Sequence, residues 1–124
     1  MNYLIVFVGG GIGAALRHGI NVGCARLCGT AFPYGTLTVN VVGSTVMGLL
    51  AGYFAFRGEA TQVWRLFLTT GILGGFTTFS SFSLDAALLW ERHEPVLAAS
   101  YVIGSVIVSI LGLFAGLYLV RQIT

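Results

Sequence analysis

The residues of this sequence whose types could do chemistry are concentrated in the stretch Gly-Gly-Phe-Thr-Thr-Phe-Ser-Ser-Phe-Ser at positions 74–83. It holds two adjacent glycines, five hydroxyls and three phenylalanines. Hydroxyls donate hydrogen bonds and the edge of an aromatic ring carries partial positive charge, so both groups suit an anion. Glycine lacks a β-carbon and accepts unusual dihedral angles, so the pair Gly74-Gly75 predicts an interruption of any helix at this point.

Such an interruption would order the polar groups that follow it. Helical spacing places Ser80 and Ser81 on one flank near Thr77, and Phe79 and Phe82 on the opposite flank. Non-helical backbone at membrane depth must be buried in protein or line a water-filled cavity. Its freed carbonyls can coordinate a cation, and the freed amides at the start of a half-helix favour anions.

A second group of polar residues recurs every four positions upstream. Thr36, Asn40 and Ser44 therefore share one helix face. The Asn40 amide offers two donors and one acceptor oxygen. Two interpretations of Asn40 remain open: a donor along a polar pathway, or a polar side chain that joins two membrane helices.

A third group lies near the C-terminus, where Tyr101, Ser105 and Ser109 are again four residues apart. These hydroxyls could continue the polar pathway. Serine in a membrane helix often bonds back to the carbonyl four residues earlier, and on this stripe alone that second interpretation is favoured.

The elements that must position these residues follow from composition. The chain has 124 residues, of which 56% are hydrophobic and 8% charged, with a mean hydropathy of +0.92. So few charges cannot cover a soluble globule, and they cannot form the basic patch that nucleic-acid binding requires. Because a bilayer-spanning helix needs roughly 20 apolar residues, the sequence predicts one domain, residues 1–124, of four transmembrane helices. Their expected ranges are Tyr3–Cys24, Tyr34–Phe56, Gln62–Trp90 and Pro95–Val120.

The arginines give little preference for either orientation in the membrane. With four spans both termini share a side, which also holds three arginines: Arg57, Arg65 and Arg121. The opposite side is expected to hold the other three: Arg17, Arg26 and Arg92. Orientation normally follows an excess of basic residues in cytoplasmic loops. This balance predicts dual topology, with copies inserted both ways and paired as an antiparallel homodimer.

Residues for catalysis are not grouped in this sequence. Asp85 is the only carboxylate close to the polar region, and a lone acid without a base or metal partner does not make an active site. Arg17 has two interpretations: a vestibule charge that attracts anions, or a charge favourable to the dipole at a helix C-terminus. The second is favoured, since a permanent charge within a pore would trap the ion. The residues alone therefore predict a narrow polar pathway for an anion and no enzyme.

Three motifs carry a resemblance to the Fluc (CrcB) family of fluoride channels over essentially the whole chain. They are Gly13-Ala-Ala-Leu-Arg17, Tyr34-Gly-Thr-Leu-Thr-Val-Asn40, and the longer Thr70-Gly-Ile-Leu-Gly-Gly-Phe-Thr-Thr-Phe-Ser-Ser-Phe-Ser83. Ser81 stands where the family usually has threonine, which preserves the hydroxyl. Asp85 stands where glutamate is common, which leaves its role open.

The resemblance implies an antiparallel dual-topology homodimer with two narrow fluoride pores, which lets fluoride leave the cell passively. It implies an integral protein of the bacterial inner membrane whose partners are fluoride, lipid and a second copy of itself. It assigns pore-lining roles to Asn40, Phe79 and Phe82, and positions along or beside the polar track to Ser80, Ser81, Tyr101, Ser105 and Ser109. It also implies a structural sodium ion at the dimer centre, held by the backbone oxygens of Gly74 and Thr77.

An alternative hypothesis is a small dual-topology exporter that exchanges organic cations for protons. Such an exporter needs a carboxylate embedded in the membrane. Spans one, two and four contain no acidic residue in their interiors, and Asp85 lies late in span three. The pattern therefore favours the channel.

Overall fold

The computed structural model describes residues 1–57 and 62–123, and all regular secondary structure within those ranges is helical. Four helical segments are long and apolar enough to cross a membrane, which confirms the predicted spans. Many large apolar side chains are exposed, including Phe7, Leu111 and Phe114, as expected of surfaces that face lipid. The helices are α1 (Asn2–Cys28), α2 (Tyr34–Arg57), α3 (Gln62–Arg65), η1 (Leu66–Leu73), α4 (Gly74–Phe76), α5 (Ser80–Glu91) and α6 (Pro95–Ile123).

The ends of the spans follow local chemistry. Helix α1 extends to Cys28, past the expected end at Cys24, and stops at Gly29, whose φ of 80° is readily adopted by glycine. Pro33 directly precedes α2, and Pro95 is the first residue of α6, where a missing N–H costs no helical bond.

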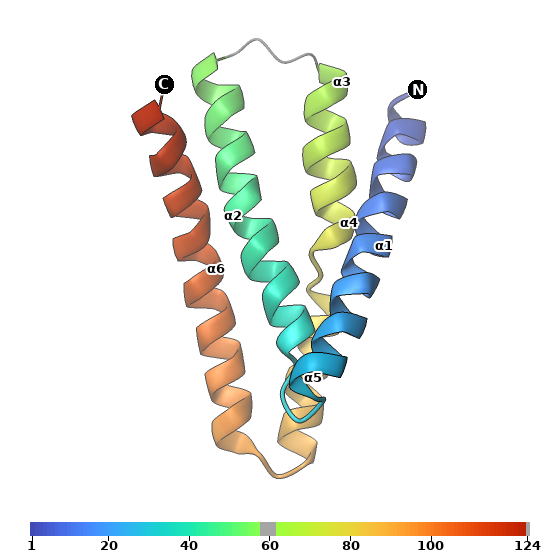
Figure 1. Cartoon of the computed structure of the whole chain (residues 1–124), viewed down its shortest axis with the longest axis vertical. Coiled ribbons are helices and arrows are strands. Elements are labelled where there is room, and N and C mark those ends of the chain that lie inside the picture. Colours follow the sequence, from blue (N-terminus) through green and yellow to red (C-terminus); the bar gives the residue numbers. More distant parts are fainter. Residues whose placement is uncertain (58–61, 124) are drawn as a thin grey trace.

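The third span changes partners along its length. It consists of α3, the π-helix η1, α4 and α5. In Figure 1 the start of α1 and the end of α6 lie at the same end of the bundle as α3. The first half of this span, η1 and α4, packs against α1, whereas α5 packs against α6. Helices α2 and α6 pack against each other extensively. A span with different neighbours above and below its middle is easier to accommodate when its two halves can be oriented separately.

Glycines let α1 approach the third span backbone to backbone. A β-carbon at Gly13 would collide with the carbonyl of Ile72, and one at Gly75 would collide with the backbone of Gly10. Small residues at helix contacts allow such close approach in membranes. Gly75 is therefore explained by a close contact between helices.

The predicted break in the third span is present, but its predicted position was wrong. Gly74 is helical, with φ −62° and ψ −38°, and α4 continues to Phe76. The helix is interrupted at residues 77–79, where Thr77 is extended with φ −84° and ψ 158°. The conformational freedom of Gly74-Gly75 is not used there; the interruption occurs where side chains supply alternative partners for the backbone.

Candidate functional site

A cavity of about 490 Å³, which we call the central groove, opens beside the break. It is bounded by α2, the break, the start of α5, and the middle of α6. It brings together seven of the ten residues to which the resemblance assigns a pore, polar-track or sodium-binding role: Asn40, Gly74, Thr77, Phe79, Phe82, Ser105 and Ser109. The remaining lining residues are Gly43, Ser44, Met47, Thr78, Val106 and Leu113.

The amide of Asn40 pairs with the backbone of the break. Its Nδ2 donates to the Thr78 carbonyl at 3.0 Å, and its Oδ1 accepts from the Thr78 N–H at 2.9 Å. Two bonds to one residue fix the rotation of the amide. The second proton on Nδ2 is not needed for this pair and remains for another acceptor. The two interpretations of Asn40 are thus compatible: it joins two spans, and it still lines the groove.

The threonines of the break also bond within the protein. Thr77 Oγ1 donates to the Leu73 carbonyl at 2.9 Å, the back-bond common for hydroxyls in membrane helices. Thr78 Oγ1 accepts from the Ser81 N–H at 3.2 Å, and so caps the start of α5. Both hydroxyls shape the backbone.

The hydroxyls of α6 behave differently. Ser105 is buried, with 4% of its surface exposed, and Ser109 is half-buried with its oxygen covered. Neither Oγ has a hydrogen-bond partner among the residues that the structure describes. The back-bond that the sequence favoured for them is therefore absent. Both residues line the central groove.

Two phenylalanine rings line the same groove. The ring centroids of Phe79 and Phe82 are 5.7 Å apart, and Phe82 contacts Tyr101 at 5.1 Å. Phe79 is 77% exposed and lies in the break between α4 and α5. An exposed ring on an open groove is available both to an ion and to a second protein chain.

Three of the predicted polar-track residues lie outside the central groove. Ser80 is exposed, with its Oγ 3.4 Å from that of Thr78. Ser81 lines a second cavity of about 490 Å³ near the α1–α2 connection, the loop-end cavity. Tyr101 is 1% exposed and donates its hydroxyl proton to Asp85 Oδ2 at 3.2 Å.

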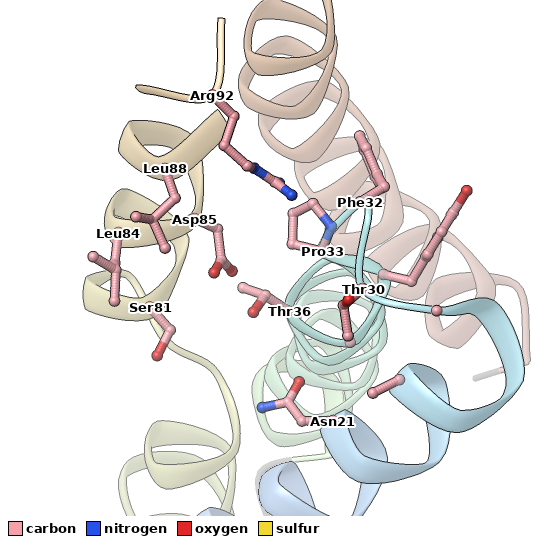
Figure 2. Close-up of a pocket in the computed structure, with 14 residues that line it drawn as sticks. Asn21, Thr30, Phe32, Pro33, Thr36, Ser81, Leu84, Asp85, Leu88 and Arg92 are labelled. Carbon is pink, nitrogen blue, oxygen red and sulfur yellow. The ribbon is translucent and has the colours of Figure 1, made fainter. Parts of the chain in front are cut away.

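Figure 2 shows the loop-end cavity, where Asn21, Thr36, Ser81 and Asp85 converge from α1, α2 and α5. Sequence reasoning gave Asp85 no role and did not single out Asn21. The four-residue spacing between Ser81 and Asp85 was the available signal for Asp85. Asn21 had no comparable signal, because its position depends on how α1 packs against α2.

Arg17 corrects another expectation. It lies well inside α1, so it is neither in a loop nor at the end of its own helix. Its Nε donates to the Gly75 carbonyl at 3.1 Å. A positive charge at the end of α4 stabilises the helix dipole, as the favoured interpretation held, but the stabilised helix belongs to the third span.

The four spans and the central groove place the chain in the class of small integral membrane proteins that have a polar cavity beside a broken helix. The sequence comparisons then give the family. The family model for "CrcB-like protein, Camphor Resistance (CrcB)" matches residues 4–117, so this chain belongs to the CrcB family, and the resemblance is confirmed.

Curated relatives cover nearly the whole chain. It is 66% identical to the fluoride-specific ion channel FluC 2 of Nitrobacter hamburgensis, over all of both sequences. It is 65% identical to the fluoride-specific ion channel FluC of Rhodopseudomonas palustris strain BisB5, again over all of both. A third such channel, from Methylobacterium nodulans, is 60% identical over 98% of each sequence. These relatives are named as ion channels and not as enzymes.

Proposed function

We propose that this protein is a fluoride-selective channel that lets fluoride leave the cell down its gradient and so lowers fluoride toxicity. The observation that carries the proposal is the pair of buried, unpartnered hydroxyls of Ser105 and Ser109 in the central groove. Asn40, Phe79 and Phe82 line the same groove. The names of the relatives supply the ion, and this donor set suits a small, strongly accepting anion.

The proposed working form is an antiparallel dual-topology homodimer with two pores. Phe79 lines the central groove and is exposed, so a second copy could cover it. With Arg17 located at the break, the loop-end side keeps Arg26 and Arg92 against three arginines on the termini side. A difference of one charge is a weak topological signal.

We also propose a structural sodium ion at the dimer centre, held by the backbone oxygens of Gly74 and Thr77. The donor set fits, because hard carbonyl oxygens without a carboxylate suit a monovalent cation better than a divalent one. Within the described residues no cluster of His, Cys, Asp or Glu offers a competing metal site. The ion would supply positive charge that joins the breaks of two copies.

The proposed location is the bacterial inner membrane, in contact with lipid. The alternative, a proton-coupled exporter of organic cations, would have to use Asp85, which accepts a hydrogen bond from Tyr101. This carboxylate lines the loop-end cavity and not the central groove, so it lies off the proposed pathway.

Efflux from liposomes tests the proposal. Purified protein is reconstituted in vesicles loaded with fluoride, and external fluoride is followed with an electrode. Passive efflux that needs no proton gradient is expected. Efflux that strictly follows the proton gradient would favour the exporter, and no efflux from the protein alone would show that it lacks channel activity of its own.

Topology is tested separately. A cysteine placed at Gln122, in a background without Cys24 and Cys28, is labelled in intact cells with a reagent that cannot cross the membrane. Partial labelling from outside, completed only after permeabilisation, is expected of a mixed population. Labelling from one side alone would contradict the antiparallel dimer.

A further inference from the structure

The two carbonyls proposed to hold sodium have each lost the N–H that a continuous helix would give them. In an α-helix the N–H of each residue donates to the carbonyl four positions earlier. The Gly74 carbonyl would accept from the Thr78 N–H. That N–H donates to Asn40 Oδ1 at 2.9 Å.

The Thr77 carbonyl is freed in the same way. Its helical donor would be the Ser81 N–H, which donates instead to Thr78 Oγ1 at 3.2 Å. The backbone of Thr78 is itself held by its two hydrogen bonds with the Asn40 amide. One side chain from α2 and one hydroxyl within the break therefore divert both donors.

Gly75, whose carbonyl lies between those of Gly74 and Thr77 in sequence, is treated in the opposite way. The Gly75 carbonyl would accept from the Phe79 N–H in a continuous helix, and here it accepts from Arg17 Nε at 3.1 Å. Arg17 thus satisfies a freed carbonyl, so that oxygen has a partner without a cation. The Gly74 and Thr77 carbonyls do not have this partner.

We infer that Thr78 and Asn40 are positioning residues for the cation site. Their side chains accept from the two N–H groups that would otherwise donate to the Gly74 and Thr77 carbonyls. Arg17 binds the Gly75 carbonyl and so keeps that oxygen from the cation. This inference rests on the proposed sodium site. It assigns Asn40 two roles: its acceptor oxygen frees a cation ligand, and the residue also lines the groove. The pore and the central ion are then coupled through one amide.

Thr78 gives the sharper test, because it is not a proposed ligand. Thr78→Val keeps the shape of the side chain but cannot accept the Ser81 N–H, which can then return to the Thr77 carbonyl. Thr78→Ser keeps the acceptor. Thr69→Val is the matched control: it removes a hydroxyl of the same span that donates to the Arg65 carbonyl, and Thr69 is neither a proposed ligand nor part of the central groove. If Thr78→Val does not fold, Thr78→Ala removes the same acceptor without adding bulk.

The readouts are sodium bound per protein, measured by flame emission after dialysis at graded sodium in N-methylglucamine, and the fraction of dimer at each concentration. A net hydrogen bond of about 0.5–1.5 kcal/mol corresponds to a shift of roughly 2- to 10-fold. We expect Thr78→Val to need that much more sodium for half-saturation, and Thr78→Ser and Thr69→Val to match the wild type.

Equal half-saturation in Thr78→Val and Thr78→Ser would overturn the inference while leaving the sodium site intact. A wild-type protein that binds no sodium would overturn both the site and the inference. Fluoride efflux measured on the same samples would show whether the proposed channel function survives either result.

Discussion

Hydroxyls on two sides of the central groove are used in different ways. On the side of the break, Thr77 and Thr78 bond to the backbone of their own span. On the side of α6, Ser105 and Ser109 bond to none of the residues that the structure describes. The first pair fixes the backbone beside the groove, and the second pair has hydroxyls without partners in the helix that lines the groove.

The difference has an energetic meaning. A buried polar group without a partner typically costs about 1–3 kcal/mol. The back-bond to the preceding turn that would avoid this cost is made by Thr45, which donates to the Val41 carbonyl at 2.8 Å. Ser105 and Ser109 do not make it, and under the proposed function their hydroxyls would instead donate to the anion. A small anion that accepts from both would recover the cost.

The largest effect is expected from Asn40→Asp. The substitution keeps the acceptor for the Thr78 N–H but replaces the donor to the Thr78 carbonyl with a negative charge. Repulsion of an anion is strong in a poorly hydrated site, so fluoride efflux from liposomes should be abolished. The dimer should still form, as size-exclusion chromatography would show. Efflux like that of the wild type would remove Asn40 from the pathway.

Phe79→Ile and Phe82→Ile should each reduce fluoride efflux strongly. Phe79 is exposed, so an aliphatic side chain there costs little folding energy, and a loss of flux would report the ring edge. Phe82 also contacts Tyr101, and its substitution should add a loss of stability typically below about 1.5 kcal/mol. Thermal unfolding in detergent separates the two contributions. Near-normal flux in both variants would support a packing role for the rings.

A smaller effect is expected when both α6 hydroxyls are removed. A hydrogen bond to a charged group is worth about 1.5–3 kcal/mol, roughly a 10- to 100-fold effect, so Ser105→Ala with Ser109→Ala should slow efflux by at least about tenfold. Folding stability should not fall, because neither hydroxyl has a partner to lose. Thr45→Val, which removes a back-bonded hydroxyl on α2, is the matched control and should conduct normally. Equal flux in the wild type, the double serine variant and Thr45→Val would show that the unpartnered hydroxyls of α6 contribute no more to efflux than a back-bonded one.

The spans and most of the groove could be predicted from the sequence, because apolar length and four-residue spacing are local properties. The position of the break could not. The glycines at 74 and 75 indicated where a helix could break. However, Gly75 is needed because a β-carbon there would collide with the backbone of Gly10. The break occurs instead where the Asn40 side chain bonds to the backbone of Thr78. The role of Arg17 was hidden for the same reason. Its partner, the Gly75 carbonyl, lies 58 residues away on another span.

The smallest effect on flux is expected from Gly74→Ala, which is compared with Gly75→Ala. If the glycine pair permitted the break, Gly74→Ala and Gly75→Ala should both weaken sodium binding and dimer assembly. The structure separates them: a β-carbon at Gly75 collides with the backbone of Gly10, whereas the nearest atom at Gly74, the Thr69 carbonyl oxygen, is 3.7 Å away. Gly75→Ala should therefore lose about 1–3 kcal/mol of folding stability, the usual cost of overpacking.

Gly74→Ala should fold, dimerise and conduct like the wild type, because helical dihedrals at position 74 suit alanine and Asn40 and Thr78 still hold the break. Unfolding in detergent, dimer fraction and fluoride efflux are measured on both variants. A Gly74→Ala protein that loses dimer and flux while keeping its folding stability would return the origin of the break to the glycines.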